Sequence, residues 1–412
     1  MKAKPHGPIP PGYRAGDDGV LRIGGMSALA LAKQGTPQFV YDLGLVTQRV
    51  RDLRAAMPAS LSIHYAIKAN SHPDLLSAMA GLVDGFDVAS GGELHKAVAA
   101  GMAPQRISFA GPGKRHEELS AAIRAGATIN LESEGEAERA LHIGEALGVA
   151  AQLAVRVNPD FELKGSGMRM GGGAKPFGID ADRVPALIRR IAVSAADYRG
   201  LHIFAGSQAL DPKALIEAQA NTLALAARLS EAAGVAPPHL NLGGGFGVPY
   251  FAGDLALDVA AIGAALEREL KARAPVLADT HMAIELGRYL VAEAGVYLTR
   301  IVDRKTSHGE TFLVVDGGLH HQLAASGNFG TVIRRNYPIA LADRFAAPAE
   351  EVVHVVGCLC TPLDRLGDAV EFPRADVGDV VALFLAGAYG ASASPSAFLG
   401  HPAALERVVG IA

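Results

Sequence analysis

Residues 61–70, LSIHYAIKAN, open the alternating pattern that decides the fold. A short apolar stretch ends here in a lysine and an asparagine, and longer Ala/Leu-rich segments of helical period follow it. The alternation continues to about residue 286 and predicts βα units around a parallel sheet. Eight strands are expected, at 61–66, 85–89, 106–110, 128–131, 152–157, 199–204, 239–242 and 281–285, with helices such as 91–100, 115–124, 133–147, 183–194, 211–233 and 257–273. Eight parallel strands close a TIM (β/α)8 barrel, which gives the α/β class.

After about residue 290 the sequence changes to β-rich segments separated by glycine and proline. Strands are expected at 296–303, 311–316, 352–357 and 379–386, and they predict a second, all-β domain. We therefore expect residues 1–40 to be an N-terminal segment that contributes to the β domain. Residues 41–290 then form the barrel, and residues 291–412 form the C-terminal β domain.

The composition limits the classes of function. The 412 residues are 50% hydrophobic and 19% charged, with a formal net charge of −4, so the chain can bury a large core. Without long runs of one sign, these charges give no reason to expect nucleic acid or a membrane as partner. The first 18 residues lack the apolar segment of a signal peptide, and Cys358 and Cys360 are too close along the chain to bridge each other. We expect a cytoplasmic protein.

The active site of a TIM barrel lies at the C-terminal ends of its strands. Lys68 follows the first expected strand, and Glu285 ends the eighth. The glycine run Gly243–Gly247 follows the seventh strand and Arg288 the eighth, and loops in these places commonly bind phosphate. Each feature alone is ordinary, since a lysine after a strand is usually solvated and a glycine run is usually a turn. Together they indicate pyridoxal 5′-phosphate (PLP), to which a lysine forms a Schiff base while an acid keeps the pyridine nitrogen protonated. No residue is expected to bind a metal.

Seven short motifs between Phe39 and about Pro402 resemble one enzyme family. They are YAIKAN at 65–70, FDVAS at 86–90, GSQ at 206–208, GGGFG at 243–247, ELGR at 285–288, GCLC at 357–360 and GAYG at 387–390. Taken jointly, they resemble the fold type III PLP-dependent amino-acid decarboxylases, which include diaminopimelate and ornithine decarboxylases. The resemblance implies a barrel followed by a β domain, and a lyase of amino-acid metabolism.

The resemblance also implies a role for each matching residue. Lys68 would carry PLP and Glu285 would pair with the pyridine nitrogen. Further cofactor contacts are expected from Asp87, His202, Phe204, Ser207, Gly243, Gly244, Gly245, Gly287, Arg288 and Tyr389, and of these Ser207, the three glycine amides, Arg288 and Tyr389 would hold the phosphate. Substrate contacts are expected from Arg288, Arg334, Tyr337, Thr361 and Tyr389. Cys360 would come from the partner subunit and return a proton after carbon dioxide leaves, which makes a homodimer with shared sites part of the mechanism.

Two departures from the family pattern bear on the substrate and the cofactor contact. Phe204 stands where the family usually has a histidine that stacks on PLP; a phenyl ring can stack but cannot hydrogen-bond. The sequence leaves open whether Phe204 or His202 contacts the ring, because His202 could equally be a packed residue inside the barrel. Thr361 stands where relatives that produce diamines usually have an acid for the distal ammonium of the substrate.

Together with Met170-Gly171-Gly172 before Phe177-Gly178, Phe204 and the Cys-Thr-Pro run at 360–362 resemble the family branch that decarboxylates a glutamyl group tethered to an acyl carrier protein. They are also similar to decarboxylases associated with bacterial exosortase systems. We therefore expect α-decarboxylation of an L-amino acid, either a small molecule or a carrier-tethered aminoacyl group. One alternative is diaminopimelate decarboxylase, with Arg334 or Tyr337 meeting the distal carboxylate. Others are an amino-acid racemase and a PLP-binding protein without turnover.

Overall fold

The computed structural model describes residues 2–327 and 334–410, which form two compact units. One unit consists of residues 50–247 and 257–287. The other consists of the chain up to Arg49, Val248–Ala256 and the chain from Arg288 onward.

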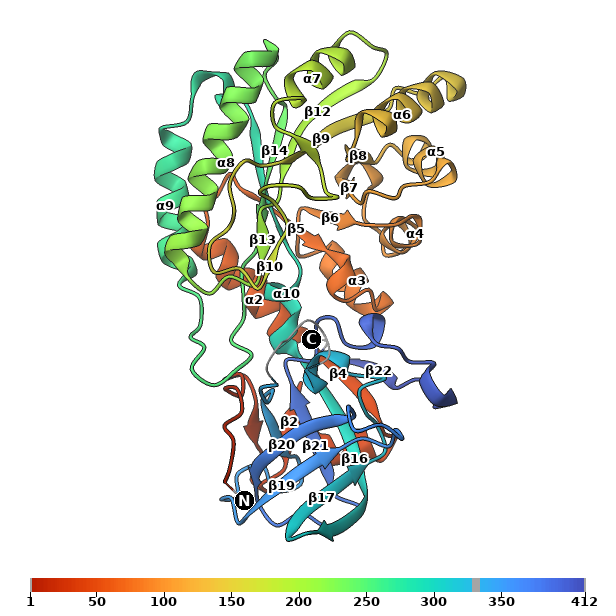
Figure 1. Cartoon of the computed structure of the whole chain (residues 1–412), viewed down its shortest axis with the longest axis vertical. Coiled ribbons are helices and arrows are strands. Elements are labelled where there is room, and N and C mark those ends of the chain that lie inside the picture. Colours follow the sequence, from red (N-terminus) through yellow and green to blue (C-terminus); the bar gives the residue numbers. More distant parts are fainter. Residues whose placement is uncertain (1, 328–333, 411–412) are drawn as a thin grey trace. The chain divides into compact units, whose positions relative to one another are not determined.

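The first unit is a closed barrel of eight parallel strands (Figure 1). In chain order they are β5 (Ser62–Ala66), β6 (Gly85–Val88), β7 (Ile107–Phe109), β8 (Thr128–Leu131), β9 (Gln152–Asn158), β12 (Asp197–Ile203), β14 (His239–Gly244) and β15 (His281–Leu286). Each strand pairs with the next in parallel, and β15 pairs with β5 to close the ring. Every strand begins and ends within two residues of its predicted position, so the predicted barrel is confirmed.

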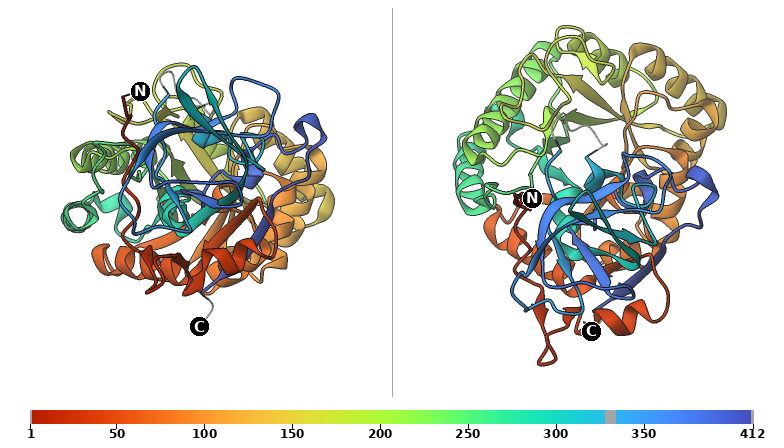
Figure 2. Two further views of the ribbon diagram at one scale, coloured as in Figure 1. Left: turned by 90° about the horizontal axis from the view of Figure 1, so that it is seen from below. Right: turned by 60° about the horizontal axis from the view of Figure 1, so that its bottom comes forward.

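Helices surround these strands as an outer ring (right-hand view of Figure 2). They are α3 (Pro73–Ala80), α4 (Gly91–Ala99), α5 (His116–Ala125), α6 (Glu134–Leu147), α7 (Val184–Ala192), α8 (Pro212–Ala233) and α9 (Val259–Lys271), and α2 (Leu43–Ala56) leads into the barrel. Their starts follow from local capping: Ser90 and Ser133 accept the backbone N–H of the residue three positions later, as N-cap side chains do. None of the described helices is long and apolar enough to cross a membrane.

The second unit is built on a β-sheet with the strand order β18-β21-β16-β17-β19-β20. In addition, β4 pairs with β16, and β22 pairs with β4. The strands are β4 (Gln38–Asp42), β16 (Gly295–Ser307), β17 (Glu310–Val315), β18 (Ile339–Leu341), β19 (Glu351–Val356), β20 (Arg365–Phe372), β21 (Val380–Phe384) and β22 (Leu405–Val409). Val40, Val296, Leu298 and Phe384 lie in its core. The pairs β17–β19 and β4–β22 are parallel, so the segments that follow β17 and β19 leave the sheet at the same edge.

Candidate active site

Lys68 and Glu285 face each other at the C-terminal ends of two paired strands. Lys68 lies in a short 3₁₀ turn directly after β5, and its Nζ is 4.0 Å from Oε1 of Glu285 on β15. The Tyr65 hydroxyl donates to the carbonyl of Asn70 and thereby fixes the turn. Gly287 lets the chain after β15 pass close to the same turn, since a Cβ there would lie 3.1 Å from the carbonyl oxygen of Ala66.

His202, on β12 two strands along from β15, contacts the same carboxylate. Its Nε2 lies 2.9 Å from Oε2 of Glu285, and both side chains are buried. Burial alone would raise the pKa of the Glu285 carboxyl. His202, and to a smaller extent the charge of Lys68, outweigh burial and lower that pKa to about 2. Glu285 is therefore ionised at neutral pH.

Phe204 lies just beyond the end of β12 and faces Lys68. The Lys68 ammonium is 5.8 Å from the centre of the phenyl ring, and the ring is half-buried. His202 and Phe204 therefore differ in surroundings: the histidine contacts Glu285, and the phenyl ring lies by the lysine.

Asp87 is also buried in the barrel, and its Oδ2 lies 3.5 Å from Nδ1 of His64 on β5. Burial disfavours the charged imidazole, but the Asp87 carboxylate outweighs burial and raises the pKa of His64. His64 is on the strand that Lys68 follows, and Asp87 is on β6, the neighbour of that strand.

The loop after β14 needs its glycines because it presses against two other strands. Gly243 and Gly245 have φ angles of 70° and 84°. A Cβ on Gly245 would lie 2.5 Å from the carbonyl oxygen of Gly206, and one on Gly244 would lie 1.9 Å from that of Glu285. The Gly243 amide donates to Asn241. Next to Gly206, the buried Oγ of Ser207 has no hydrogen-bond partner among the described residues, which is costly for a hydroxyl group.

Arg288 lies in the other unit, among three tyrosines. Its guanidinium donates to the hydroxyl of Tyr250 at 3.0 Å and lies 4.8 Å from the ring centre of Tyr389. Tyr337 is buried against Tyr250, with ring centres 4.9 Å apart. Tyr389 has a φ of 54°, which few non-glycine residues adopt.

The predicted catalytic Cys360 is exposed in the loop between β19 and β20, and Thr361 beside it is partly exposed. Arg334 donates to the carbonyls of Leu363 and Arg365. Asp364 is the one acid between Gly357 and Arg365, and it is buried. Its two carboxylate oxygens accept the amides of Leu319 and Leu359.

Comparison with known proteins identifies the family. A model of the pyridoxal-binding domain of pyridoxal-dependent decarboxylases matches residues 43–292. The chain belongs to this family.

Individual relatives agree with this assignment. The L-glutamyl-(BtrI acyl-carrier protein) decarboxylase of Niallia circulans is 37% identical, over 90% of this chain and 88% of its own. Diaminopimelate decarboxylase of Methanothermobacter thermautotrophicus is 30% identical, over 97% of this chain and 92% of its own. The crystal structure of Helicobacter pylori diaminopimelate decarboxylase complexed with L-lysine has a TM-score of 0.82 and 28% identity, covering 92% of this chain and 93% of that chain. The chain is thus a PLP-dependent amino-acid decarboxylase, as the sequence predicted.

The barrel residues of this decarboxylase fit PLP. Lys68 has an amine within reach of an ionised, buried carboxylate, which suits a protonated pyridine nitrogen. The unpartnered hydroxyl of Ser207 and the close-packed glycine loop suit a phosphate group. Once bound, PLP supplies an electron sink for the bond that breaks.

Sequence reasoning about the decarboxylase missed His64, Asn241 and Tyr250. The Asp87 partner His64 is visible in the first strand, but one strand alone does not show which residue it meets. Asn241 precedes the glycine run by two residues and holds its first amide. Tyr250 follows the same run and could have been noticed as an aromatic residue near a predicted phosphate loop.

Proposed function

We propose that this decarboxylase acts on an α-amino acid tethered to a carrier protein, with a glutamyl-like group as the substrate. The observation that carries the proposal is that the loop beside Cys360 offers no available carboxylate. Thr361 offers a hydroxyl there, and the only acid of the loop, Asp364, is buried and bonded to two backbone amides. A substrate with a distal ammonium finds no carboxylate in this loop, whereas a neutral acyl group needs none. The similarity to the Niallia circulans enzyme supports the same reading.

Each barrel residue has a proposed task. Lys68 would hold the cofactor through its amine, and Glu285 would keep the pyridine nitrogen protonated. His202 keeps Glu285 ionised and oriented, so it is a positioning residue. Phe204, which lies by the lysine amine, would contact the cofactor ring, and Ser207 would donate to the phosphate. Arg288 and Tyr389 remain phosphate and substrate residues predicted from the family pattern.

The proton that replaces carbon dioxide comes from a thiol in this proposal. Bound PLP would supply the electron sink when carbon dioxide leaves, and Cys360 of a second copy of the chain would give its thiol proton to Cα. Solvent then reprotonates the thiolate. This requires a homodimer with shared sites, and the exposure of Cys360 suits a residue that serves another chain. Cys358 and Cys360 are both free thiols, which fits the reducing conditions of the cytoplasm.

The test is carbon dioxide release from a matched panel of substrates. L-glutamate loaded on an acyl carrier protein is compared with free L-glutamate, meso-diaminopimelate, L-lysine and L-ornithine, with Lys68→Ala as the blank. We expect kcat/KM for the carrier-bound substrate to exceed that for every free amino acid by at least roughly tenfold. Faster release from free meso-diaminopimelate would replace the proposal with the diaminopimelate alternative. The similarity to the diaminopimelate decarboxylase of Methanothermobacter is the reason to include this substrate.

A further inference from the structure

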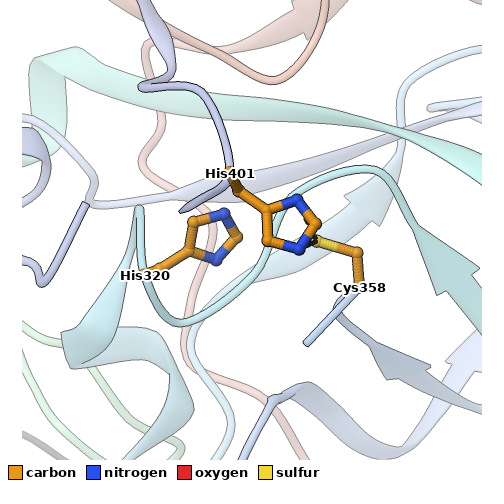
Figure 3. Close-up of side chains that lie close together, drawn as sticks. All are labelled: His320, Cys358 and His401. Carbon is orange, nitrogen blue, oxygen red and sulfur yellow. Dashed lines mark hydrogen bonds between the residues drawn. The ribbon is translucent and has the colours of Figure 1, made fainter. Parts of the chain in front are cut away.

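Three side chains from distant parts of the sequence converge in the β unit. His320 follows β17, Cys358 follows β19, and His401 precedes β22. The parallel pairing of β17 and β19 brings the first two to one edge of the sheet. Their ligand atoms all lie within 4.8 Å of one another, and the Cys358 sulfur is 3.9 Å from both ring nitrogens of His401 (Figure 3).

His320 is the second, independent sign of a ligand. Its side chain is fully buried, yet neither ring nitrogen has a hydrogen-bond partner within the described structure. Buried polar groups are nearly always satisfied, so this orphaned ring indicates a missing partner.

The neighbours of the three side chains hold their segments in place. The carboxylate of Asp364 accepts the amide of Leu319, next to His320, and the amide of Leu359, next to Cys358. His321 donates from Nε2 to the carbonyl of Pro402, next to His401. Each cluster residue therefore has a chain neighbour fixed by a hydrogen bond, so the backbone beside each of the three side chains is held in place.

We propose that His320, Cys358 and His401 bind one Zn²⁺ ion, with water as the fourth ligand. Two imidazoles and a thiolate form a donor set typical of zinc, and three protein ligands leave the fourth position open. Tetrahedral bonds of about 2.0 Å to nitrogen and 2.3 Å to sulfur place neighbouring ligand atoms about 3.5 Å apart. The sulfur is already close to that spacing, and the widest pair closes by about 1 Å.

Zinc binding here is not a redox step. The Cys358 thiol loses its proton to solvent, and the thiolate forms the zinc–sulfur bond. The ion would join the segment of His401 to the loop in which Cys360 lies two residues beyond Cys358. The site thus goes beyond the proposed function without depending on it.

The experiment uses the PLP-loaded, full-length protein without a polyhistidine tag. Zinc content is measured by mass spectrometry, and the zinc coordination shell by X-ray absorption. Zinc is then replaced by Co²⁺, whose ligand-field bands lie at longer wavelengths than PLP absorbance. We expect about one zinc per chain, with one sulfur at about 2.3 Å and nitrogen neighbours at about 2.0 Å. Cys358→Ser and His401→Ala should each lose the stoichiometric zinc and the tetrahedral cobalt bands.

Two matched controls separate this site from other binding. Cys360→Ser removes the neighbouring thiol, and His116→Ala removes an exposed histidine of the barrel unit; both should keep the metal. Circular dichroism and retained PLP absorbance check that each variant is folded. Wild-type protein that takes up neither zinc nor cobalt at one equivalent overturns the proposal. So do cobalt bands that survive in both cluster variants.

Discussion

Replacing His202 with leucine should destabilise the PLP-free barrel by about 2 to 3 kcal/mol. The change leaves the Glu285 carboxylate buried and without the partner that lies 2.9 Å away. Leaving a buried charged group without its close polar partner costs about 1 to 3 kcal/mol or more. Lys68, 4.0 Å from the same carboxylate, remains and limits the loss.

The lowered pKa of Glu285 gives a second measure of the folding free energy that the partners of this carboxylate contribute. A fall from 4.5 to about 2 corresponds to about 3 kcal/mol of net stabilisation of the ionised carboxyl, after its partners, chiefly His202, have offset the cost of burial. Because the folded pKa is lowered, this stabilisation is present above pH 4.5 and is lost as pH falls toward about 2. At pH 7 the carboxyl is ionised in folded and unfolded chains, so a difference measured there reports the missing partner.

The assay is urea unfolding at pH 7, followed by circular dichroism, of the wild type, His202→Leu and His202→Gln. The glutamine amide places a donor where Nε2 of the histidine stands, so His202→Gln should regain about half of the loss. PLP dissociation is measured alongside, because Glu285 also faces Lys68. A leucine variant as stable as the wild type would refute the reasoning, and so would a glutamine variant no better than leucine.

Three further predictions concern the cofactor, the substrate and the dimer. Phe204→Ala should weaken PLP retention and shift the cofactor absorbance, whereas Phe204→Tyr, which keeps a ring beside Lys68, should not; equal retention in both variants would remove Phe204 from the cofactor contacts. Thr361→Glu should raise kcat/KM for L-lysine and L-ornithine relative to carrier-bound glutamate, because it supplies the missing carboxylate, and an unchanged ratio would place the distal substrate group elsewhere. Mixing Lys68→Ala with Cys360→Ala chains should restore about a quarter of native activity by random pairing, and no recovery despite subunit exchange would count against shared sites.

The barrel could be predicted because each strand carries its own signal along the chain. Contacts between strands carry no such signal. β12 and β15 are separated by β14, so the contact of His202 with Glu285 crosses the barrel interior, and neither strand alone reveals it.

In the β unit, too, contacts between distant segments could not be predicted from the sequence. The strand Arg365–Phe372 was not predicted, because it contains a glycine and charged residues within its short apolar run. Asp368 there is paired with Arg365 and Lys4, a residue from the other end of the chain. The zinc cluster likewise joins residues 81 positions apart, from His320 to His401, and only the sheet brings them together.

The glycine loop shows why a motif and its function have to be tested separately. Gly244 and Gly245 are needed where a Cβ would strike neighbouring backbone, so replacing either would disturb the barrel whether or not the loop binds phosphate. Ser207 is the better probe, because its buried hydroxyl makes no hydrogen bond within the described chain. Ser207→Ala should leave the PLP-free barrel as stable as the wild type or slightly more stable, since it removes an unsatisfied group. It should weaken PLP binding by roughly 10- to 100-fold, the value of one hydrogen bond to a charged phosphate. Unchanged PLP affinity would show that the Ser207 hydroxyl does not bind the phosphate.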